Sequence, residues 1–361
     1  MKKGWQTKTL GDVCAFDKAQ GIHRGLPYVG LEHIESHTAR FIGSSEAQPV
    51  KSATFRFSDK HVLYGRLRPY LNKALAPDFE GHCSTEIFPL KPRPELSRDY
   101  LLFWLLADET CDRINATCTG ARMPRAQMND VLGFEIPVPP LAEQQRIVGL
   151  LDEAFEGLAT AKANAEKNLQ NASALFESHL QSVFTQRGPG WVETTIGDQL
   201  TLQRGFDITK GQQNTGEVPV VSSGGIKSYH DKAMAKGPGV VIGRKGTLGK
   251  VFYLESDYWP HDTTLWVKDF KGNSPRFVYY LFAGLDVKKL DSGAANPALN
   301  RNQVHPIEVT WPHVAKQKAL VETLDSLEEQ TQRLDRIYER KVAALEALKK
   351  SLLHQAFTGA L

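Results

Sequence analysis

The sequence predicts an α+β protein. We expect two mixed α/β domains separated by two long α-helices, which form an antiparallel intrachain coiled coil with a pseudo-two-fold internal repeat. The first observation is a repeated opening, because Gly4–Asp12 and Gly190–Asp198 share Gly, Trp, Thr, Gly and Asp in the same register. The second is a pair of long stretches that contain almost no Gly or Pro, which is typical of helices. The resulting order is domain, helix, domain, helix, as in a duplicated scaffold.

The composition is that of a globular protein. The chain has 361 residues, 41% hydrophobic and 24% charged, which is enough for two domains with separate cores. No apolar run reaches the roughly 20 residues that span a bilayer, and Met1–Trp5 lacks the apolar stretch of a signal peptide. We therefore expect a cytoplasmic protein with no membrane partner. The net charge of +3 is small, so any nucleic-acid contact must come from local basic patches.

The cysteines give no sign of a metal site. Cys14, Cys83, Cys111 and Cys118 form no CxxC pair and have no histidine at metal-binding spacing. We expect them to be reduced and structural.

Four segments follow from the change of hydrophobic period along the chain. They are 1–138, 139–187, 188–312 and 313–361. The first carries short β-branched and aromatic runs and one helical segment at Asp99–Ala107. The texture changes at Pro139, where the first long helix begins. The third segment is again mixed, with its clearest strands at Val240–Ile242 and Leu265–Val267, and the fourth is the second long helix.

The two predicted helices have complementary apolar lines. Residues in the second helix step by four and three, which is a heptad seam. Its members are Leu320, Leu324, Leu327, Leu334, Leu345, Leu348 and Leu352. The line 173 residues earlier is rich in alanine, and its larger members are Ile147, Leu151, Leu158 and Leu175. Large side chains on one helix can fill the space beside small ones on the other, so we predict pairing within the chain. A solvated helix or an intermolecular coiled coil is the alternative.

Two corresponding loops carry the groups that DNA binding needs. Each opens with Gly-Arg, at Gly65 and at Gly243. The predicted DNA-binding residues of these loops are Arg66, Arg68, Tyr70, Asn72, Lys73, Arg244, Lys245 and Lys250. Glycine lets the backbone approach a ligand, Lys and Arg neutralise phosphates, and Arg and Asn can bind base edges. For any single residue, an ordinary solvated loop is the alternative.

A second group of candidates lies shortly before each long helix. Its members are Arg122, Arg125, Gln127, Asn300, Arg301, Asn302 and Gln303. Their side chains both donate and accept hydrogen bonds, as a base reader must, but Asn and Gln at such places also form turns and caps. Lys227 and Tyr229 complete the predicted set. Weaker candidates are Lys18, His23, Arg24, Tyr28, Arg204, Lys210 and His230. We expect Trp5 and Trp191 to be core anchors.

These features resemble the specificity (S) subunit of Type I restriction-modification systems. The resemblance rests on the repeated opening, the Gly-Arg loops and a repeated P-x-x-A-x-Q-x-x-(I/L)-V entry to each helix, and it covers the whole chain. The residues of this entry are Pro139, Ala142, Gln144, Ile147 and Val148, and Pro312, Ala315, Gln317, Leu320 and Val321. One departure is that the loop after Gly65 reads Arg-Leu-Arg-Pro, so base contacts cannot be transferred between the copies.

The resemblance implies a function in DNA recognition and host defence. Each mixed domain would be a target-recognition domain that binds one half of a bipartite, asymmetric double-stranded DNA target. The helical rod would set the spacer and dock two methyltransferase subunits that bind S-adenosylmethionine, and restriction subunits that use ATP and Mg can join. The alternatives are a coiled-coil protein-binding scaffold without DNA specificity and a subunit of a methylation-only or Type IIB-like system.

No catalytic or metal-binding residues are predicted in this chain, and no cofactor. Gly243–Val251 has the wrong spacing for a phosphate-binding Walker A loop. Asn296–Leu299 lacks the second proline and the aromatic ring of an adenine methyltransferase motif. Asp78 and Glu86 could be a nuclease pair, but no lysine follows Glu86 at the spacing usual for metal-dependent nucleases. We therefore expect a non-catalytic subunit.

Overall fold

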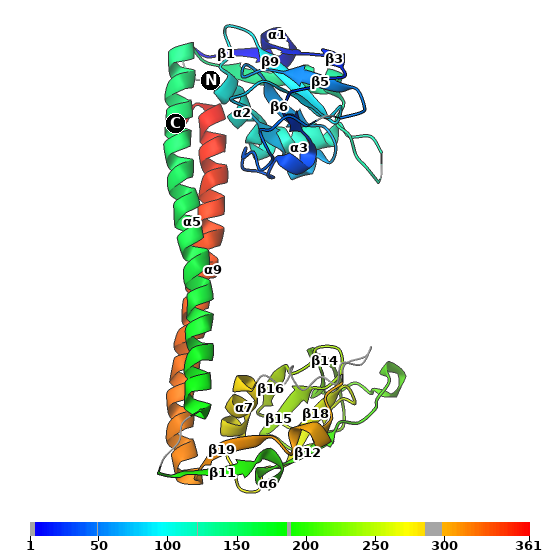
Figure 1. Cartoon of the computed structure of the whole chain (residues 1–361), viewed down its shortest axis with the longest axis vertical. Coiled ribbons are helices and arrows are strands. Elements are labelled where there is room, and N and C mark those ends of the chain that lie inside the picture. Colours follow the sequence, from blue (N-terminus) through cyan, green and yellow to red (C-terminus); the bar gives the residue numbers. More distant parts are fainter. Residues whose placement is uncertain (1–3, 49, 121, 186–188, 286–297) are drawn as a thin grey trace. The chain divides into compact units, whose positions relative to one another are not determined.

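The computed structural model describes residues 4–48, 50–120, 122–185, 189–285 and 298–361. The chain forms two compact units, the first made of Met1–Ala165 with Arg340–Leu361 and the second of Glu166–Glu339. Each unit contains one mixed domain and a part of both long helices, α5 (Leu141–Phe184) and α9 (Val314–Thr358) (Figure 1). The four-segment division of the sequence stays a prediction. Its boundary at 187/188 and the Asn296–Pro297 pair lie outside the described residues.

The first mixed domain consists of small sheets closed by a terminal strand pair. That pair is β1 (Gln6–Thr9) with β10 (Glu135–Val138), antiparallel. One sheet has the order β2 (Cys14–Phe16), β9 (Ile87–Pro92), β6 (Val62–Gly65), β7 (Ala74–Leu75). The other has the order β3 (Gln20–Gly21), β5 (Thr54–Phe57), β8 (Gly81–Cys83), β4 (Tyr28–Val29). The α-helices are α1 (Leu10–Val13), α2 (Arg98–Leu106), α3 (Asp108–Ala116) and α4 (Met128–Leu132), and the 3-10 turns are η1 (Leu31–His33) and η2 (Pro69–Leu71).

The second mixed domain repeats this plan. Its terminal pair is β11 (Trp191–Thr195) with β19 (Glu308–Pro312). One sheet has the order β12 (Thr201–Arg204), β18 (Thr264–Asp269), β15 (Gly239–Gly243), β16 (Val251–Leu254). The other has the order β14 (Gly225–His230), β13 (Val218–Ser222), β17 (Trp259–Pro260). The helical segments are α6 (Ile196–Gln199), η3 (Lys210–Gln212), α7 (Pro275–Gly284) and α8 (Arg301–Val304).

The internal repeat extends to side-chain contacts. In both openings the threonine hydroxyl donates a 2.7 Å hydrogen bond to an aspartate oxygen, from Thr9 to Asp12 and from Thr195 to Asp198. The same aspartate oxygen also accepts from the backbone N–H of the threonine, at 3.2 Å in the first opening and 3.4 Å in the second, which caps the start of α1 and of α6 and explains why Thr and Asp recur. The sequence pattern therefore reports a shared local structure.

The repeated glutamine of the helix entry fastens each long helix to its own domain. Gln144 is fully buried, and its Oε1 accepts a 2.7 Å hydrogen bond from the backbone N–H of Ser97, which precedes α2. Gln317 is equally buried and accepts one of 2.9 Å from Ser274, which precedes α7. Both glutamines also donate to the carbonyl of the proline that precedes their helix. A buried amide with these partners fixes how the helix leaves the domain.

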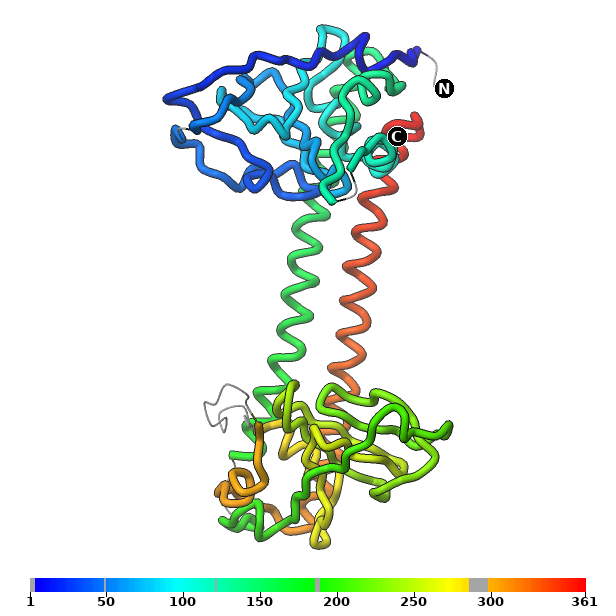
Figure 2. Tube along the Cα trace, turned by 90° about the vertical axis from the view of Figure 1, so that its right-hand side faces the viewer, coloured from blue at the N-terminus to red at the C-terminus, as the bar shows by residue number. Residues whose placement is uncertain are grey.

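The long helices pair within each unit and run antiparallel (Figures 1 and 2). In the first unit, Ile147 near the start of α5 shares a core with Leu353 near the end of α9. In the second, Leu180 near the end of α5 shares a core with Leu324 near the start of α9. Start therefore meets end in both units, which confirms intrachain pairing. No helix in the described ranges is both long and apolar enough to cross a membrane.

The predicted seam is wrong at three positions. Leu175, Leu334 and Leu348 are 65%, 42% and 47% exposed. The inner line of α5 instead continues through Ala172, Phe176, Leu180 and Val183, which are buried or half-buried. Residues 172 and 183 are eleven apart, so this end of α5 follows an 11-residue spacing. The physical reason is that a 3.6-residue helix drifts away from a strict heptad unless such a step corrects it. Of the other predicted positions, Ile147, Leu151 and Leu324 are buried, and Leu158, Leu320, Leu327, Leu345 and Leu352 are half-buried.

Candidate nucleic-acid interface

Both Gly-Arg loops are held by the same backbone hydrogen bonds. The N–H of Gly65 donates to Lys73 at 2.8 Å, and that of Gly243 donates to Lys250 at 2.7 Å. In the second loop a side chain at position 243 would overlap the carbonyl oxygen of Thr247, so the close loop requires glycine there. The two loops are thus equivalent in backbone and different in side chains.

The arginine of each loop joins two further segments through its backbone. The N–H of Arg66 donates to Glu86 O at 2.9 Å, and that of Arg244 donates to Thr263 O at 2.8 Å. The carbonyl oxygens of the same two arginines accept from Ala126 and from Leu299, both at 2.9 Å. The loop, the turn before the following strand and the segment before the long helix therefore meet at one place in each domain. Both groups of sequence candidates lie there.

The first domain exposes only some of its predicted residues. Arg68, Tyr70 and Arg122 are exposed, whereas Arg66 is half-buried with its guanidinium 5.3 Å from the Phe88 ring centre. Half-buried Lys73 donates from Nζ to Leu31 O at 2.6 Å.

Asn72 corrects the prediction. It is fully buried, and its Nδ2 donates to Leu106 O at 3.1 Å, so this side chain does not face a ligand. Asn72 has a φ of 41°, and Asn tolerates this left-handed conformation better than most residues do. Backbone conformation and burial thus account for the asparagine.

Arg125 and Gln127 are engaged within the first domain. Arg125 Nε lies 3.0 Å from both carboxylate oxygens of Glu86, and its Nη1 donates to Met123 O. The Glu86 carboxylate raises the pKa of Arg125. Gln127 Nε2 donates to Thr119 Oγ1 at 2.8 Å. These contacts brace the segment that approaches α5, which leaves Arg125 little donor capacity for DNA.

The second domain exposes more of its predicted residues. Lys227, Tyr229, Lys245, Lys250, Arg301 and Asn302 are exposed, and Arg244 is half-buried. Exposed Asn300 caps α8, because its Oδ1 accepts from the backbone N–H of Asn302 at 3.1 Å. Half-buried Gln303 completes this capping box by accepting from Asn300 N at 2.9 Å. The contacts of Asn300 and Gln303 are therefore those of a helix cap, which was the alternative to base reading for these residues.

An open hollow of about 570 Å³ lies between the Gly-Arg loop and the start of α8 in the second domain. Arg204, Arg244 and Arg301 line it, together with Asp207 and Asn300. Among them, Arg204 was only a weak sequence candidate. The hollow brings together one residue at the end of β12, one from the loop and two from the α8 segment.

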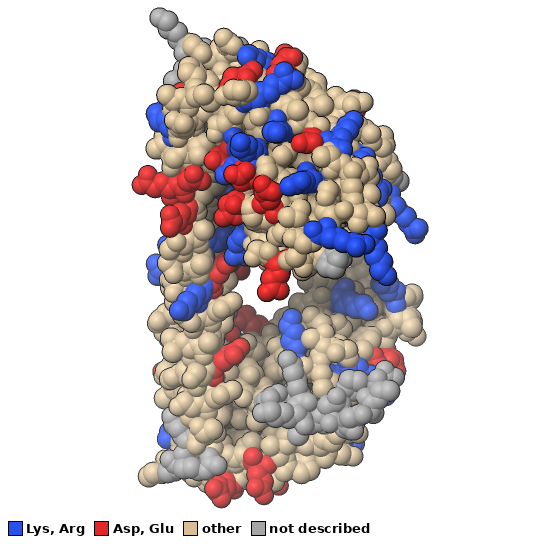
Figure 3. All heavy atoms as spheres, turned by 45° about the horizontal axis from the view of Figure 1, so that its top comes forward, with Lys and Arg blue, Asp and Glu red and all other residues tan. Residues whose placement is uncertain are grey.

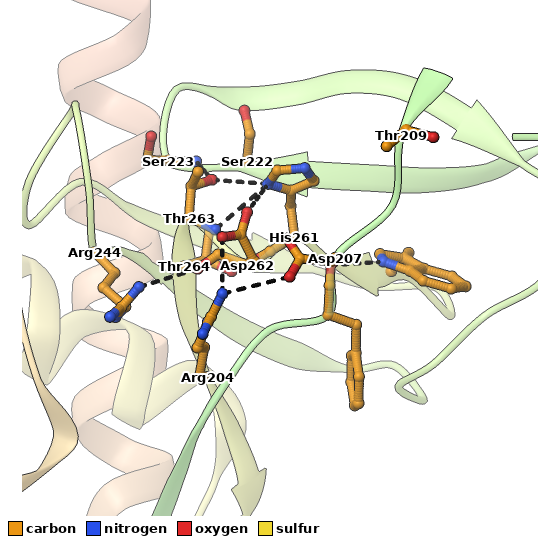
Figure 4. A network of polar contacts seen from close by, with 12 residues as sticks. Arg204, Asp207, Thr209, Ser222, Ser223, Arg244, His261, Asp262, Thr263 and Thr264 are labelled. Atoms are coloured by element: carbon orange, nitrogen blue, oxygen red, sulfur yellow. Dashed lines mark hydrogen bonds and ion pairs between the residues drawn. The ribbon is translucent and has the colours of Figure 1, made fainter. Parts of the chain in front are cut away.

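A carboxylate organises this hollow (Figure 4). Arg204 Nη2 lies 3.0 Å from Asp262 Oδ2 and 3.5 Å from Asp207 Oδ2. Asp262 Oδ1 is 2.9 Å from His261 Nδ1, and Arg244 Nη1 donates to Asp262 O at 3.4 Å. Sequence reasoning missed Asp262 and His261. A signal was available in the sequence. His261 and Asp262 lie just before the buried strand β18, and in the first copy a carboxylate, Glu86, lies just before the buried strand β9.

The remaining weak candidates are scattered. His230 is buried, and its Nδ1 accepts from Asn214 N at 3.0 Å, so it is not a surface residue. Lys18, Arg24 and Lys210 are exposed, while His23 and Tyr28 are half-buried beside the His82 ring. On the face shown in Figure 3, Lys and Arg of the first unit line the side away from the helices, and Asp and Glu gather closer to them.

Within the described residues, neither the cysteines nor any cluster of possible metal ligands indicates a metal site. Cys14, Cys83 and Cys111 are buried free thiols, and Cys118 is half-buried and free. Burial raises the pKa of the Cys14 thiol to about 12. No group of three His, Cys, Asp or Glu residues in the described part could hold a metal ion.

Sequence comparison finds one family twice in the chain. The model of the Type I restriction modification DNA specificity domain matches residues 2–169 and 189–340. The chain is 28% identical over 179 residues to the Type I restriction enzyme EcoDI specificity subunit of Escherichia coli, a match that covers 49% of this chain and 39% of that protein. It is 21% identical over 339 residues to the putative type I specificity subunit S.MpnORF507P of Mycoplasma pneumoniae, with 89% of each protein covered.

Structural comparison agrees on the fold. A chain from a study of complex assembly and conformational transition of the type I R-M system matches with a TM-score of 0.87 and 19% identity, covering 100% of this chain and 99% of that one. The HsdS subunit from Thermoanaerobacter tengcongensis matches with a TM-score of 0.65 and 20% identity, covering 100% and 98%. With both specificity domains identified, the resemblance seen in the sequence is confirmed, and this chain belongs to the family of Type I restriction-modification DNA specificity subunits.

Proposed function

We propose that each mixed domain binds one half of a bipartite, asymmetric double-stranded DNA target. The observation that carries this proposal is that Arg66 and Arg244 make equivalent backbone hydrogen bonds in the two domains while the side chains around them differ. A shared frame with different side chains is expected of two readers that present different groups to different sequences. Arg68, Tyr70 and Arg122 are available in the first domain, and Lys227, Lys245 and Lys250 in the second.

The paired helices would set the spacer between the two half-sites and dock two methyltransferase subunits. When two DNA-reading domains share one connector, the distance between the domains and the separation of the half-sites that they bind are geometrically linked. Support for docking comes from apolar side chains that the helix pair leaves exposed, namely Leu150, Leu175, Leu334, Ile337 and Leu348. Exposed apolar side chains on a helical surface are typical of protein contacts.

The chain itself would be non-catalytic and would work with its partners in the cytoplasm. S-adenosylmethionine would be bound by the methyltransferase subunits, and ATP and Mg by restriction subunits where these join. The role of this chain would be to place the complex on a particular DNA sequence.

The first test is to co-express the chain with a methyltransferase encoded beside it, purify the complex and map methylated adenines across the host genome. We expect a stable complex and a split motif with a fixed gap, both lost when the chain is deleted. A complex without a sequence motif would favour the protein-binding scaffold.

The second test separates the two readers. Arg66→Gln and Arg244→Gln are introduced singly, and methylation is mapped for each complex. We expect each substitution to weaken selection of one half-site and to leave the base preference of the other half-site intact. Equal relaxation of both half-sites would contradict the two-reader proposal.

A further inference from the structure

We infer that Arg204 reads a base edge in the half-site of the second domain and that Asp262 is the residue that positions it. This inference rests on the proposed function and makes it more specific. The ligand would be a base with paired acceptors, of which guanine is the clearest case. Arg204 lies at the end of β12 and lines the hollow between the Gly-Arg loop and α8.

The first argument is that the Arg204 guanidinium is held in place. Asp262, whose side chain is only 16% exposed, binds Arg204 Nη2 at 3.0 Å and is itself 2.9 Å from His261 Nδ1. His261 Nδ1 is in turn 3.1 Å from Thr263 Oγ1, which accepts a hydrogen bond from the backbone N–H of Ser223. The chain of contacts visible in Figure 4 therefore ends in the backbone before β14. An arginine fixed in this way loses less conformational freedom when it binds a base.

The second argument is the local charge, which disfavours a phosphate. Two carboxylates flank Arg204, and one of them, Asp207, is 81% exposed at a distance of 3.5 Å. A phosphate that approached this guanidinium would also approach the Asp207 carboxylate, and like charges repel. A base edge carries only partial charges, and a carboxylate beside it can accept from an exocyclic amino group. Lys245 has no carboxylate partner in the described residues and suits a phosphate better.

The third argument concerns the donors that remain. Asp262 and Asp207 contact Nη2, whereas Nη1 and Nε of Arg204 make no hydrogen bond within the part of the chain that the structure describes. A guanidinium has five N–H donors in a rigid plane, so those on Nη1 and Nε remain for a ligand. Guanine presents two acceptors, O6 and N7, on its major-groove edge. The match predicts a guanine at one position of this half-site.

The test uses the complete complex with its methyltransferase subunits and a pool of randomised DNA duplexes. Bound duplexes are sequenced for the wild type and for Arg204→Lys, Asp262→Asn and Lys245→Gln. The binding constant is also measured across a range of salt concentrations. Lysine keeps the charge at position 204 but loses the planar fork, so this substitution separates base reading from charge alone. Lys245→Gln is the matched phosphate-contact variant in the same domain.

We expect Arg204→Lys to lower discrimination at a single guanine position by about tenfold, with the salt dependence unchanged. Asp262→Asn should relax the same position by a smaller factor, because the amide still offers one acceptor. Lys245→Gln should weaken binding to all sequences and reduce the slope of log K against log salt by about 0.9, with base preferences intact. Recovery of each complex at the wild-type yield shows that the variant has folded.

Three outcomes overturn the inference. One is weaker binding to all sequences in Arg204→Lys without relaxation at any position, which would make Arg204 a contact that does not depend on sequence. Another is relaxation by Asp262→Asn at a different position. The third is an unchanged profile in Arg204→Lys. In all three, a wild-type complex that still selects a split sequence leaves the proposed function standing. A wild-type complex that selects no split sequence would instead refute the proposed function.

Discussion

Arg276 of α7 binds Asp325 of α9, with 2.7 Å between Nε and Oδ1. Its Nη2 lies 2.6 Å from Glu328 Oε2, and its guanidinium is about 5 Å from the ring centres of Tyr253, Tyr279 and Tyr280. The two ion pairs join the second mixed domain to α9, and the cation–π contacts with rings of β16 and α7 hold the guanidinium on its own domain. Arg276 is two residues after Ser274, and Asp325 is eight after Gln317. In the first unit, the residues at the same distances from Ser97 and Gln144 are Asp99 and Asp152, which are both carboxylates.

Replacing Arg276 should loosen the second unit. Arg276→Ala removes both ion pairs and leaves two carboxylates without a cation. Because the site is only partly buried, we expect a loss of about 1–2 kcal/mol in the free energy of unfolding, less than for a fully buried pair. Urea unfolding, with hydrogen exchange of α7 as the local readout, measures it. Arg333→Ala is the control, since Arg333 is exposed on α9 and makes no ion pair or side-chain hydrogen bond within the described residues. Equal effects of the two substitutions would contradict the assignment.

Removal of the Asp152 carboxylate should stabilise the first unit, whereas removal of its equivalent, Asp325, should destabilise the second. Burial, and then the Asp99 charge, raise the pKa of Asp152. A carboxyl with a raised folded-state pKa disfavours folding above that pKa and stops doing so as pH falls through it. Asp152→Asn should therefore stabilise the first unit at neutral pH, by about 0.3 kcal/mol as for other exposed like-charge pairs, with no gain in acid. Asp325→Asn should destabilise the second unit, because it weakens the Arg276 pair. Urea midpoints measured at neutral and acidic pH decide this, and a gain that persists in acid would exclude the charge explanation.

Asn300 should act mainly through the end of α8. Asn300→Ala removes the cap and should cost about 1 kcal/mol in the free energy of unfolding, whereas Asn300→Ser keeps a capping oxygen and should cost little. Unfolding curves of both variants measure the cap. The same variants also separate the two interpretations of this residue when their complexes select DNA from a random pool. A base-reading Asn300 would lose specificity in the serine variant despite normal stability.

The fold was largely predictable because duplication leaves a pattern in the sequence. Equivalent residues such as Gln144 and Gln317 have equivalent buried contacts, so the repeat could be found from residue identity alone. The seam prediction failed at Leu175 because apolar identity does not reveal which residues of a long helix face its partner. That depends on accumulated drift, which a strict heptad ignores.

The site was less predictable, since residue type does not reveal where a side chain points. Asn72 has the chemistry of a base reader but is buried, and Arg125 has the right charge but is bound to Glu86. Conversely, Asp262 was missed because an acidic residue is not an obvious part of a DNA-binding surface. Its importance comes from its 3.0 Å contact with Arg204, a residue 58 positions away in the sequence.

The helix pair should act as a ruler, and its length can be changed without breaking the seam. One heptad inserted after Ala165 in α5 and another after Glu339 in α9 would add seven residues to both helices at the boundary between the two compact units. Seven residues add about 10 Å at the helical rise, which corresponds to about three base pairs. A complex with both insertions should therefore select a gap that is longer by two or three base pairs, measured by mapping methylated adenines. Insertion into α5 alone shifts the helices out of register and should impair methylation without defining a new gap. A complex with both insertions that methylates the original motif with its original gap would show that something other than the helices sets the spacing.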